Sequence, residues 1–197
     1  MSDSETIRVY DDRAAEYAEI NARDSTADQT LRAFIDACPP NGRVLDLGCG
    51  PGASAAEMAR AGLVVAACDA SAEMVALAAR HAGVNAFQAV FTDISGTDLY
   101  DGIWASFSLL HAPRADFPDH LAALHRALKP GGAFFIGMKL GTGQARDSIA
   151  RLYTYYTVQE LNKYLTAAGF LDLSSVLGSS VGLDGKMADY VAITAHG

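Results

Sequence analysis

Apolar and polar residues alternate along most of this chain between strand-like runs and helix-like stripes. Apolar runs that predict buried strands cover residues 43–47, 63–68, 86–91, 102–108 and 133–138. Between these runs, apolar residues recur three and four positions apart, which predicts helices, and glycines or prolines separate the elements. Regular alternation of strand and helix predicts crossover connections, which place a mostly parallel sheet between two layers of helices.

The last part of the chain departs from this alternation. Residues 171–177 and 190–195 predict two strands with no helix between them, joined through a turn at Asp184-Gly185. We therefore expect an antiparallel hairpin at one edge of the sheet. Before it, Thr157 and Glu160 form a capping box that opens a helix, and Gly169 follows the end of that helix.

The first part of the chain precedes the alternating pattern. Residues 1–40 predict helices that end at Pro39 and Pro40, with Tyr10 and Tyr17 on one face of the first. The remaining residues, 41–197, form a complete alternating core without them. We expect a single domain in which a helical lid covers a site on that core.

Charge and cysteine content narrow the function classes. The net charge is −8 and the isoelectric point is about 4.9, which argues against binding to a nucleic-acid backbone. Three cysteines, Cys38, Cys49 and Cys68, form no C-x-x-C pair, so we expect neither a disulfide framework nor a metal site. There is no signal-peptide pattern and no apolar run near the ~20 residues of a membrane span. These features predict a cytoplasmic protein.

The strongest chemical signal is a glycine-rich turn directly after the first strand. Gly48, Gly50 and Gly52 lie where the next helix begins, and glycine lets backbone approach a ligand without a clash from Cβ. Ligands of open α/β sheets bind outside the carboxyl ends of the strands. Asp46 precedes the turn and can accept a hydrogen bond from a ligand ammonium. The alternative is a tight strand-to-helix turn without a ligand.

Two further carboxylates follow the next two strands. Asp69 is placed to accept hydrogen bonds from the two ribose hydroxyls of a nucleoside; its other possible role is to cap the following helix, which Ser71 can also do. Asp93 can accept a bond from an adenine amino group, with the backbone of Ile94 facing the ring. The alternative for Asp93 is a turn residue.

As a set, these residues resemble the class I methyltransferases that use S-adenosylmethionine (SAM). Residues 44–52 are similar to that family's first motif, Asp69 to its acid after the second strand and Asp93 to its adenine-binding acid. The resemblance implies a seven-stranded Rossmann-like sheet of order 3-2-1-4-5-7-6 with the seventh strand antiparallel. It also implies SAM as cofactor and S-adenosylhomocysteine as product. Further cofactor contacts are implied for Ala70, Ser106, Tyr10 and Tyr17.

The acceptor end of the site is less clear. His111, just past the fourth strand, is a candidate general base, with a structural or cofactor-contacting role as the alternative. After the fifth strand, residues 139–156 gather basic and aromatic side chains that suit a small anionic acceptor. A solvated loop with core tyrosines explains the same cluster. Its candidate substrate residues are Lys139, Arg146, Arg151, Tyr153 and Tyr155.

The sequence therefore predicts SAM-dependent methyl transfer to a small-molecule acceptor of unknown identity. Two alternatives remain open: a SAM-binding protein without catalysis, acting as a sensor or partner subunit, and a nicotinamide-dependent oxidoreductase. The G-x-G-x-G spacing and Asp93 argue against the oxidoreductase. The oligomeric state is not predicted.

Overall fold

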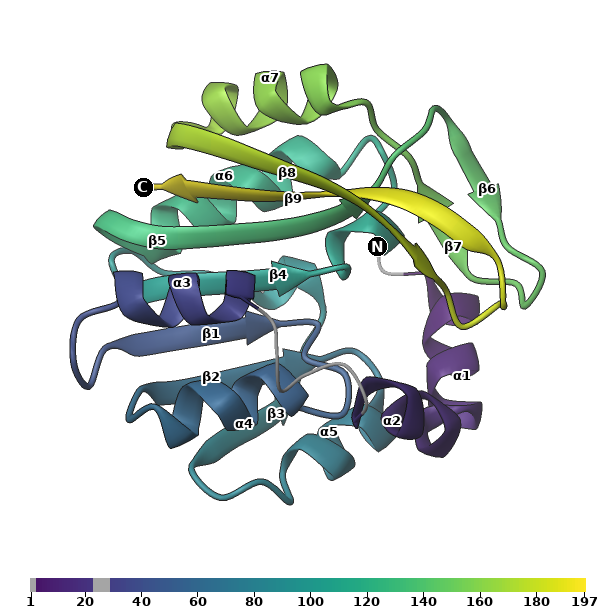
Figure 1. Ribbon diagram of the computed structural model, residues 1–197, viewed down its shortest axis with the longest axis horizontal. Helices are drawn as coiled ribbons and strands as arrows, with labels where there is room; N and C mark the ends of the chain where they lie inside the picture. The colour runs from purple at the N-terminus through teal and green to yellow at the C-terminus, as the bar shows by residue number, and fades with distance from the viewer. Residues whose placement is uncertain (1–2, 23–28) are drawn as a thin grey trace.

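One seven-stranded sheet organises the molecule. The computed structural model describes residues 3–22 and 29–197. The sheet has the order β3-β2-β1-β4-β5-β9-β8, and β9 runs antiparallel to both of its neighbours (Figure 1). This confirms the predicted Rossmann-like topology and edge hairpin. The strands are β1 (Arg43–Leu47), β2 (Val64–Asp69), β3 (Val84–Gln88), β4 (Tyr100–Ser106), β5 (Leu128–Lys139), β8 (Leu171–Val181) and β9 (Met187–His196).

Helices cover both faces of the sheet, because successive strand residues point to opposite sides. On β1, Val44 and Leu45 are both fully buried, yet they belong to two different apolar clusters. The cluster containing Leu45 lies under α6 (Phe117–Ala127) and α7 (Val158–Ala168). The cluster containing Val44 lies under α3 (Gln29–Ala37) and α4 (Ala53–Arg60). The result is the predicted three-layer sandwich.

The predicted capping box and turn are confirmed. The Thr157 hydroxyl accepts a bond from the backbone N–H of Glu160 at 3.2 Å, and the Glu160 carboxylate accepts from the backbone N–H of Thr157 at 2.8 Å. Gly169 follows α7 with φ of 107°, a left-handed conformation that suits glycine. Gly185 has φ of 75° in the turn between β8 and β9. Local sequence chemistry therefore sets these element ends.

Several predicted boundaries were wrong. β3 ends at Gln88 rather than residue 91, because residues 91–93 form a short 3-10 helix. The strand after α6 begins at Leu128 rather than at residue 133 and includes Pro130 to Gly132. Leu128 and residues 133–137 pair with β4, and between them the backbone N–H of Gly131 donates to the carbonyl of Gly197 at 2.7 Å.

Two other expectations also change. Residues 144–146 (β6) and 152–154 (β7) pair as a small antiparallel hairpin that the sequence did not predict. Phe34 of α3 packs on Trp104 with ring centroids 5.2 Å apart, so α3 is a layer of the sandwich. Because α3 covers the sheet face, we restrict the lid hypothesis to α1 (Ser4–Asp12) and α2 (Ala14–Ala22).

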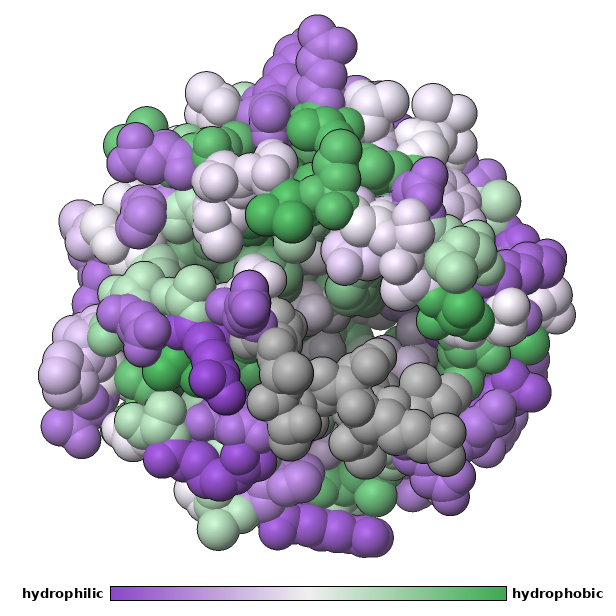
Figure 2. Space-filling model, in the orientation of Figure 1, coloured by the Kyte–Doolittle hydropathy of each residue, from purple (hydrophilic) through white to green (hydrophobic). Residues whose placement is uncertain are grey.

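The N-terminal helices lie beyond the carboxyl ends of the strands. Figure 1 shows α1 between the start of α5 (Ala72–Ala78) and the β6–β7 hairpin. No helix among residues 3–22 and 29–197 is long and apolar enough to cross a membrane. Edge strand β8 exposes Val176 and Leu177, and Figure 2 shows apolar side chains gathered over this edge.

Candidate active site

A cavity lies between the carboxyl ends of the strands and the N-terminal helices. It encloses about 720 Å³ of empty space, which includes space open to solvent. Its lining includes Gly48 and Gly50 from the glycine turn and Asp69 and Ala70 after β2. Further lining residues, on its other sides, are Tyr10, Tyr17, Ser106 and His111. Eight predicted site residues therefore meet around one cavity.

The glycine turn and Asp69 are held together by backbone geometry. The backbone N–H of Gly50 donates to Asp69 Oδ2 at 2.9 Å, and the N–H of Ser71 donates to Asp69 Oδ1 at 2.9 Å. Gly48 has φ of 70°, and a Cβ there would stand 2.2 Å from the Cβ of Ser108. Burial raises the pKa of Asp69, and the two N–H groups oppose that shift. The turn thus presents open backbone beside a carboxylate that is already oriented.

Asp46 and Gly52 lie near the turn but do not line the cavity. Asp46 is 2% exposed, and its Oδ2 has no hydrogen-bond partner among the described residues. Burial raises the pKa of Asp46 to about 7, and the charge of Asp69 adds to the shift. A Cβ on Gly52 would stand 2.8 Å from Ala78, so this glycine serves the packing of α4 against α5. Contact between Asp46 and a ligand ammonium stays a prediction.

The predicted adenine residues are placed differently from the other cofactor candidates. The Asp93 carboxylate accepts a bond from the backbone N–H of Val90 at 2.9 Å, a local contact that fits the turn residue that was its alternative. Ile94 is buried in the apolar core. The wall at this position comes from residues 89–91, which follow β3. The adenine role of Asp93 and Ile94 stays a prediction.

Helix α1 is tied to the site by hydrogen bonds at both of its ends. Ser71 Oγ donates to Asp11 Oδ1 at 2.6 Å, next to Asp69. Near the start of the helix, the Thr6 hydroxyl accepts from the backbone N–H of Leu152 at 2.8 Å. The rings of Tyr10 and Tyr17 meet edge to face, with centroids 5.4 Å apart. In this structure α1 therefore closes over the cavity.

His111 lies at the opposite end of the cavity from Asp69. Its Nδ1 is 2.6 Å from the carbonyl oxygen of Leu152, and its Nε2 is 2.8 Å from the hydroxyl of Tyr10. A carbonyl only accepts, so Nδ1 carries the proton and Nε2 is the basic nitrogen. Burial lowers the pKa of His111 to about 4; the Leu152 carbonyl opposes this shift. His111 is thus a neutral imidazole near pH 7 with its basic nitrogen on the cavity side.

Arg151 lies behind His111 and Tyr10, away from the cavity. It is 2% exposed, and its Nε donates to Asp147 Oδ2 at 2.9 Å. Its Nη1 donates to the Tyr10 hydroxyl at 3.0 Å, and Tyr153 packs edge to face on His111 with centroids 4.7 Å apart. Neither Arg151 nor Tyr153 is among the residues that line the cavity. They support its acceptor end from behind.

The rest of the basic-aromatic cluster is farther from the cavity. Arg146 Nη2 forms an ion pair with Asp3 at 2.8 Å, and its Nε forms another with Glu5 at 3.2 Å. Lys139 Nζ lies 4.3 Å from the centre of the Tyr153 ring, on which Tyr155 stacks. The positive charges of Arg146 and Arg151 are already matched by carboxylates, so this geometry does not favour an anionic acceptor.

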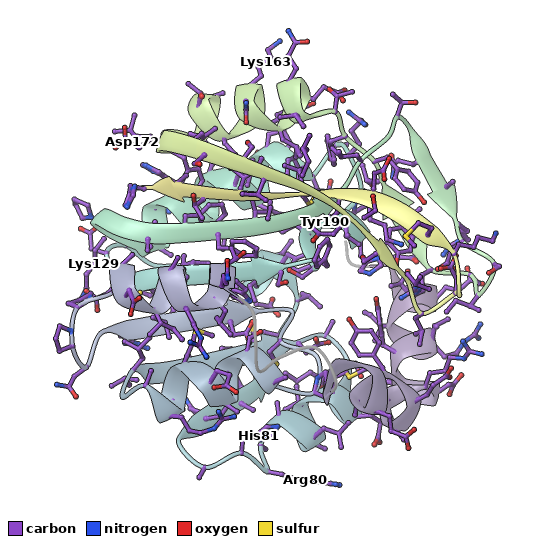
Figure 3. The ribbon with its side chains drawn as sticks, in the orientation of Figure 1. Arg80, His81, Lys129, Lys163, Asp172 and Tyr190 are labelled. Atoms are coloured by element: carbon purple, nitrogen blue, oxygen red, sulfur yellow. The ribbon has the colours of Figure 1, made fainter. Side chains whose placement is uncertain are left out.

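Sequence reasoning missed several cavity residues after β4. Phe107 has φ of 52°, unusual for a bulky residue, and its ring meets that of Tyr190, labelled in Figure 3, edge to face at 5.4 Å. The buried hydroxyl of Ser108 has no hydrogen-bond partner among the described residues. Their place directly after a parallel strand was the available signal. His120 is buried, and its ring centroid lies 5.5 Å from that of Phe91.

Comparisons with known proteins agree with this site. Residues 44–132 match the family model described as a methyltransferase domain. A ubiquinone biosynthesis O-methyltransferase of Xanthomonas campestris is 35% identical over 107 residues, which are 49% of this chain and 43% of that protein. The chain thus spans less than half the length of that relative.

Two solved structures resemble nearly the whole chain. The 1,6-didemethyltoxoflavin-N1-methyltransferase of Burkholderia thailandensis, with bound S-adenosylhomocysteine, is 25% identical with a TM-score of 0.67; the match covers 93% of this chain and 86% of that one. A SAM-dependent methyltransferase of Methanosarcina mazei has a TM-score of 0.72 at 19% identity, covering 83% and 96%, and shows the fold alone. The fold, the glycine turn and the match of residues 44–132 to a methyltransferase domain together support a SAM-dependent methyltransferase.

Proposed function

We propose that this chain catalyses transfer of a methyl group from SAM to a small-molecule acceptor inside the described cavity. One observation carries the proposal: the same cavity is lined by the glycine turn and Asp69 at one end and by His111 at the other. A site that only binds SAM would need the glycine turn and Asp69 but not His111. A neutral base facing the same space adds the means to remove a proton from an acceptor.

The residues present fit the cofactor of this family. A Cβ at Gly48 or Gly50 would narrow the turn, since the first would meet Ser108 and the second would stand 3.3 Å from the ring of Tyr17. Each carboxylate oxygen of Asp69 accepts one N–H, which leaves lone pairs for ribose hydroxyls. SAM supplies a methyl group activated by its positively charged sulfur.

The residues of this chain would then bind the cofactor, enclose the cavity and deprotonate the acceptor. Gly50 and Asp69 would hold the nucleoside, while α1 excludes water from above through its bonds to Ser71 and Leu152. Alignment of the acceptor with the methyl group is the main source of rate enhancement for such a reaction. His111 is the base for an acceptor that arrives protonated, because its Nε2 is free of a proton.

The named relatives support a small acceptor without identifying it. One is named for O-methylation in ubiquinone biosynthesis and the other for methylation at N1 of didemethyltoxoflavin. We therefore leave open whether oxygen or nitrogen is methylated. The three cysteines are free and buried, which supports a reducing compartment, and we propose the cytoplasm.

Binding and turnover need separate tests. Isothermal titration with SAM, S-adenosylhomocysteine and NAD identifies the ligand, and we expect dissociation constants for the first two in the range of ~1 μM to 1 mM. Asp69→Ala should weaken SAM binding by about 1.5–3 kcal/mol, the value of a lost charge-assisted hydrogen bond. Binding of NAD without SAM would refute the assignment.

Release of S-adenosylhomocysteine across a panel of metabolites tests catalysis. We expect turnover that depends on the acceptor supplied. Tight SAM binding with no turnover on any compound would instead favour the sensor or partner-subunit alternative, because fold and cofactor residues do not by themselves imply catalysis.

A further inference from the structure

A chain of hydrogen bonds runs from a buried ion pair to the basic nitrogen of the site. Arg151 Nη1 lies 3.0 Å from the Tyr10 hydroxyl, and that hydroxyl lies 2.8 Å from His111 Nε2. His111 Nδ1 lies 2.6 Å from the carbonyl oxygen of Leu152. Tyr10 and His111 both line the cavity, whereas Arg151 and Leu152 stand behind it.

The direction of every bond in this chain follows from its two ends. A guanidinium has only donors, so the Tyr10 oxygen must accept from Arg151. A carbonyl has only acceptor capacity, so His111 Nδ1 must donate and Nε2 must accept. The Tyr10 proton therefore points at His111.

A tyrosine hydroxyl in this arrangement can offer the cavity only one kind of interaction. Its proton is directed to His111, and Arg151 occupies one of its two lone pairs. The second lone pair can accept a hydrogen bond from a ligand, so a partner at this point must be a donor. His111 also lines the cavity, but its Nε2 is already paired with the hydroxyl of Tyr10.

We propose that Tyr10 receives the proton of the methyl acceptor and passes its own proton to His111, so that the acceptor is an O–H or N–H compound. The inference rests on the proposed function and deepens it. Tyr10 is then a catalytic residue, in addition to any part it has in covering the cofactor. Arg151 is a positioning residue that acts through Tyr10.

Methyl transfer and proton transfer are coupled in this step. The O–H or N–H bond of the acceptor breaks, and its electron pair stays on the nucleophile to form the bond to the methyl carbon. The released proton binds the Tyr10 oxygen while the Tyr10 proton moves to Nε2 of His111. The carbon–sulfur bond breaks with its pair on sulfur. The resulting imidazolium keeps its Nδ1 bond to Leu152 and loses its proton to solvent when α1 opens.

Asp147 holds the guanidinium in place for this role. Its Oδ2 lies 2.7 Å from Arg151 Nη2, and its Oδ1 accepts from the backbone N–H of Arg151 at 2.9 Å. The carboxylate and the guanidinium are 6% and 2% exposed as side chains, so neither is free to turn toward solvent. The charged groups around His111 are thus Arg151 and Asp147 from the β6–β7 hairpin and Lys139 from β5.

A binding experiment tests the donor requirement without using activity. Protein saturated with S-adenosylhomocysteine is titrated with 4-methylphenol and with 4-methylanisole, which lacks the hydroxyl proton. We expect the phenol to bind about 10-fold more tightly, the value of one hydrogen bond, and Tyr10→Phe to abolish the difference. The matched control is Tyr164→Phe on α7, which should retain it. Equal binding of both probes, or no binding of the phenol, would overturn the proposal.

Nitrogen NMR of protein labelled with ¹⁵N-histidine tests the bond directions. We expect His111 as the Nδ1–H tautomer in the wild type, retained in Arg151→Lys, whose ammonium also only donates. Arg151→Met should change the Nε2 signal, and the Lys variant covers the case in which the Met variant fails to fold. An Nε2–H tautomer in the wild type would contradict the chain of bonds.

Kinetics then separate the inference from the proposed function. With any acceptor that the wild type methylates, Tyr10→Phe should lower kcat about 100-fold while the SAM dissociation constant changes less than about 3-fold. Unchanged kcat in Tyr10→Phe would refute the relay. A failure of S-adenosylhomocysteine to bind would refute the proposed function instead, while the nitrogen spectrum still tests the proton path.

Discussion

The two ends of the cavity are built in different ways. At the cofactor end, the bond between the Gly50 N–H and Asp69 joins residues 19 positions apart, through the ends of neighbouring strands. At the acceptor end, Tyr10 meets His111 and Arg151 across 101 and 141 positions. The cofactor end is formed by backbone groups and one carboxylate. The second is assembled from side chains of α1, the β6–β7 hairpin and the segment after β4.

This difference indicates that the two ends can be altered separately. The cofactor end depends on strand pairing inside the core, which is lost only when the domain unfolds. The acceptor end depends on polar contacts of a peripheral helix, and the segments that move in such enzymes have few buried apolar contacts. Variants of the first end should lose the cofactor, and variants of the second should keep it.

Gly48→Ala is expected to have the largest effect. The new Cβ would stand 2.2 Å from the Cβ of Ser108, at a backbone φ of 70°. Backbone must shift on both sides of the cavity, so we expect SAM binding to fall at least about 100-fold and stability to fall by about 3 kcal/mol. Calorimetry with and without SAM measures both quantities.

The matched control for this variant is Gly62→Ala. Gly62 has φ of 91°, yet nothing lies within 4 Å of a Cβ placed there. It should lose about 1–2 kcal/mol of stability from the left-handed conformation alone and bind SAM normally. Equal losses in the two variants would mean that backbone strain, and not the approach of Ser108, explains the effect at Gly48.

Asp46→Asn should move stability and binding in opposite directions. The pKa of Asp46 is about 7 in the folded protein because of burial, against an ordinary value near 4. The folded state therefore binds this proton more tightly, and stability is lost as pH rises from about 4 to 7. The neutral variant should be more stable than the wild type at pH 8, by about 4 kcal/mol, and nearly equal at pH 4.

Binding provides the second half of that test. If Asp46 accepts a bond from the cofactor ammonium, the same substitution should weaken SAM binding about 10-fold at pH 8. Thermal unfolding across pH, with and without SAM, measures both effects. A variant that is no more stable at pH 8 would show that the buried carboxylate is compensated in some other way.

The sequence was informative where a few neighbouring residues decide the structure. β1, the glycine turn, the α7 capping box and the edge hairpin were predicted because strand pattern and turn chemistry are local. The start of β5 at Leu128 was missed because the residues between Leu128 and Ala133 carry a Pro-Gly-Gly turn signal and do not pair with β4. The β6–β7 hairpin was missed because strands of three residues are too short to show a strand period.

The residues of the candidate site also differ in whether the sequence could place them. Gly48, Gly50 and Asp69 could be placed at one cavity from their spacing alone. The buried pair of Arg151 and Asp147 could not, since its burial depends on α1 folding over the hairpin. Arg151 was considered as a group that binds a substrate anion, with a solvated loop as the alternative. Asp147 lies only four positions away, but sequence spacing carries no record that the pair is buried.

The pH dependence of catalysis should distinguish the acceptor end from ordinary histidine chemistry. Burial lowers the pKa of His111 to about 4, so the imidazole stays neutral where an ordinary histidine, with a pKa near 6.5, is protonated. At pH 5.5 the rate would fall about 10-fold with an ordinary histidine base, because most of it is protonated, whereas the rate with His111 should hardly change. The logarithm of kcat/KM should therefore stay flat down to about pH 5 in Asp46→Asn, which removes the titration of Asp46 near pH 7. A decline centred near pH 6.5 would mean that His111 is solvated during catalysis.

Arg146→Ala should have the smallest effect. It should alter only the contacts that hold α1 over the cavity. Arg146 links β6 to α1 through Asp3 and Glu5, and its side chain is 40% exposed, so solvent screens these pairs. We expect unchanged SAM affinity, unchanged acceptor KM and a modest rise in amide exchange of residues 4–12, because one tether of α1 is lost. Hydrogen exchange with and without SAM measures this, and SAM should restore protection if α1 closes over the cofactor.

Lys163→Ala, at a position that Figure 3 shows pointing away from α7 into solvent, is the matched control and should leave exchange of α1 unchanged. A rise in acceptor KM for Arg146→Ala alone would instead support direct recognition of an anionic acceptor, and would assign the basic cluster to the substrate after all.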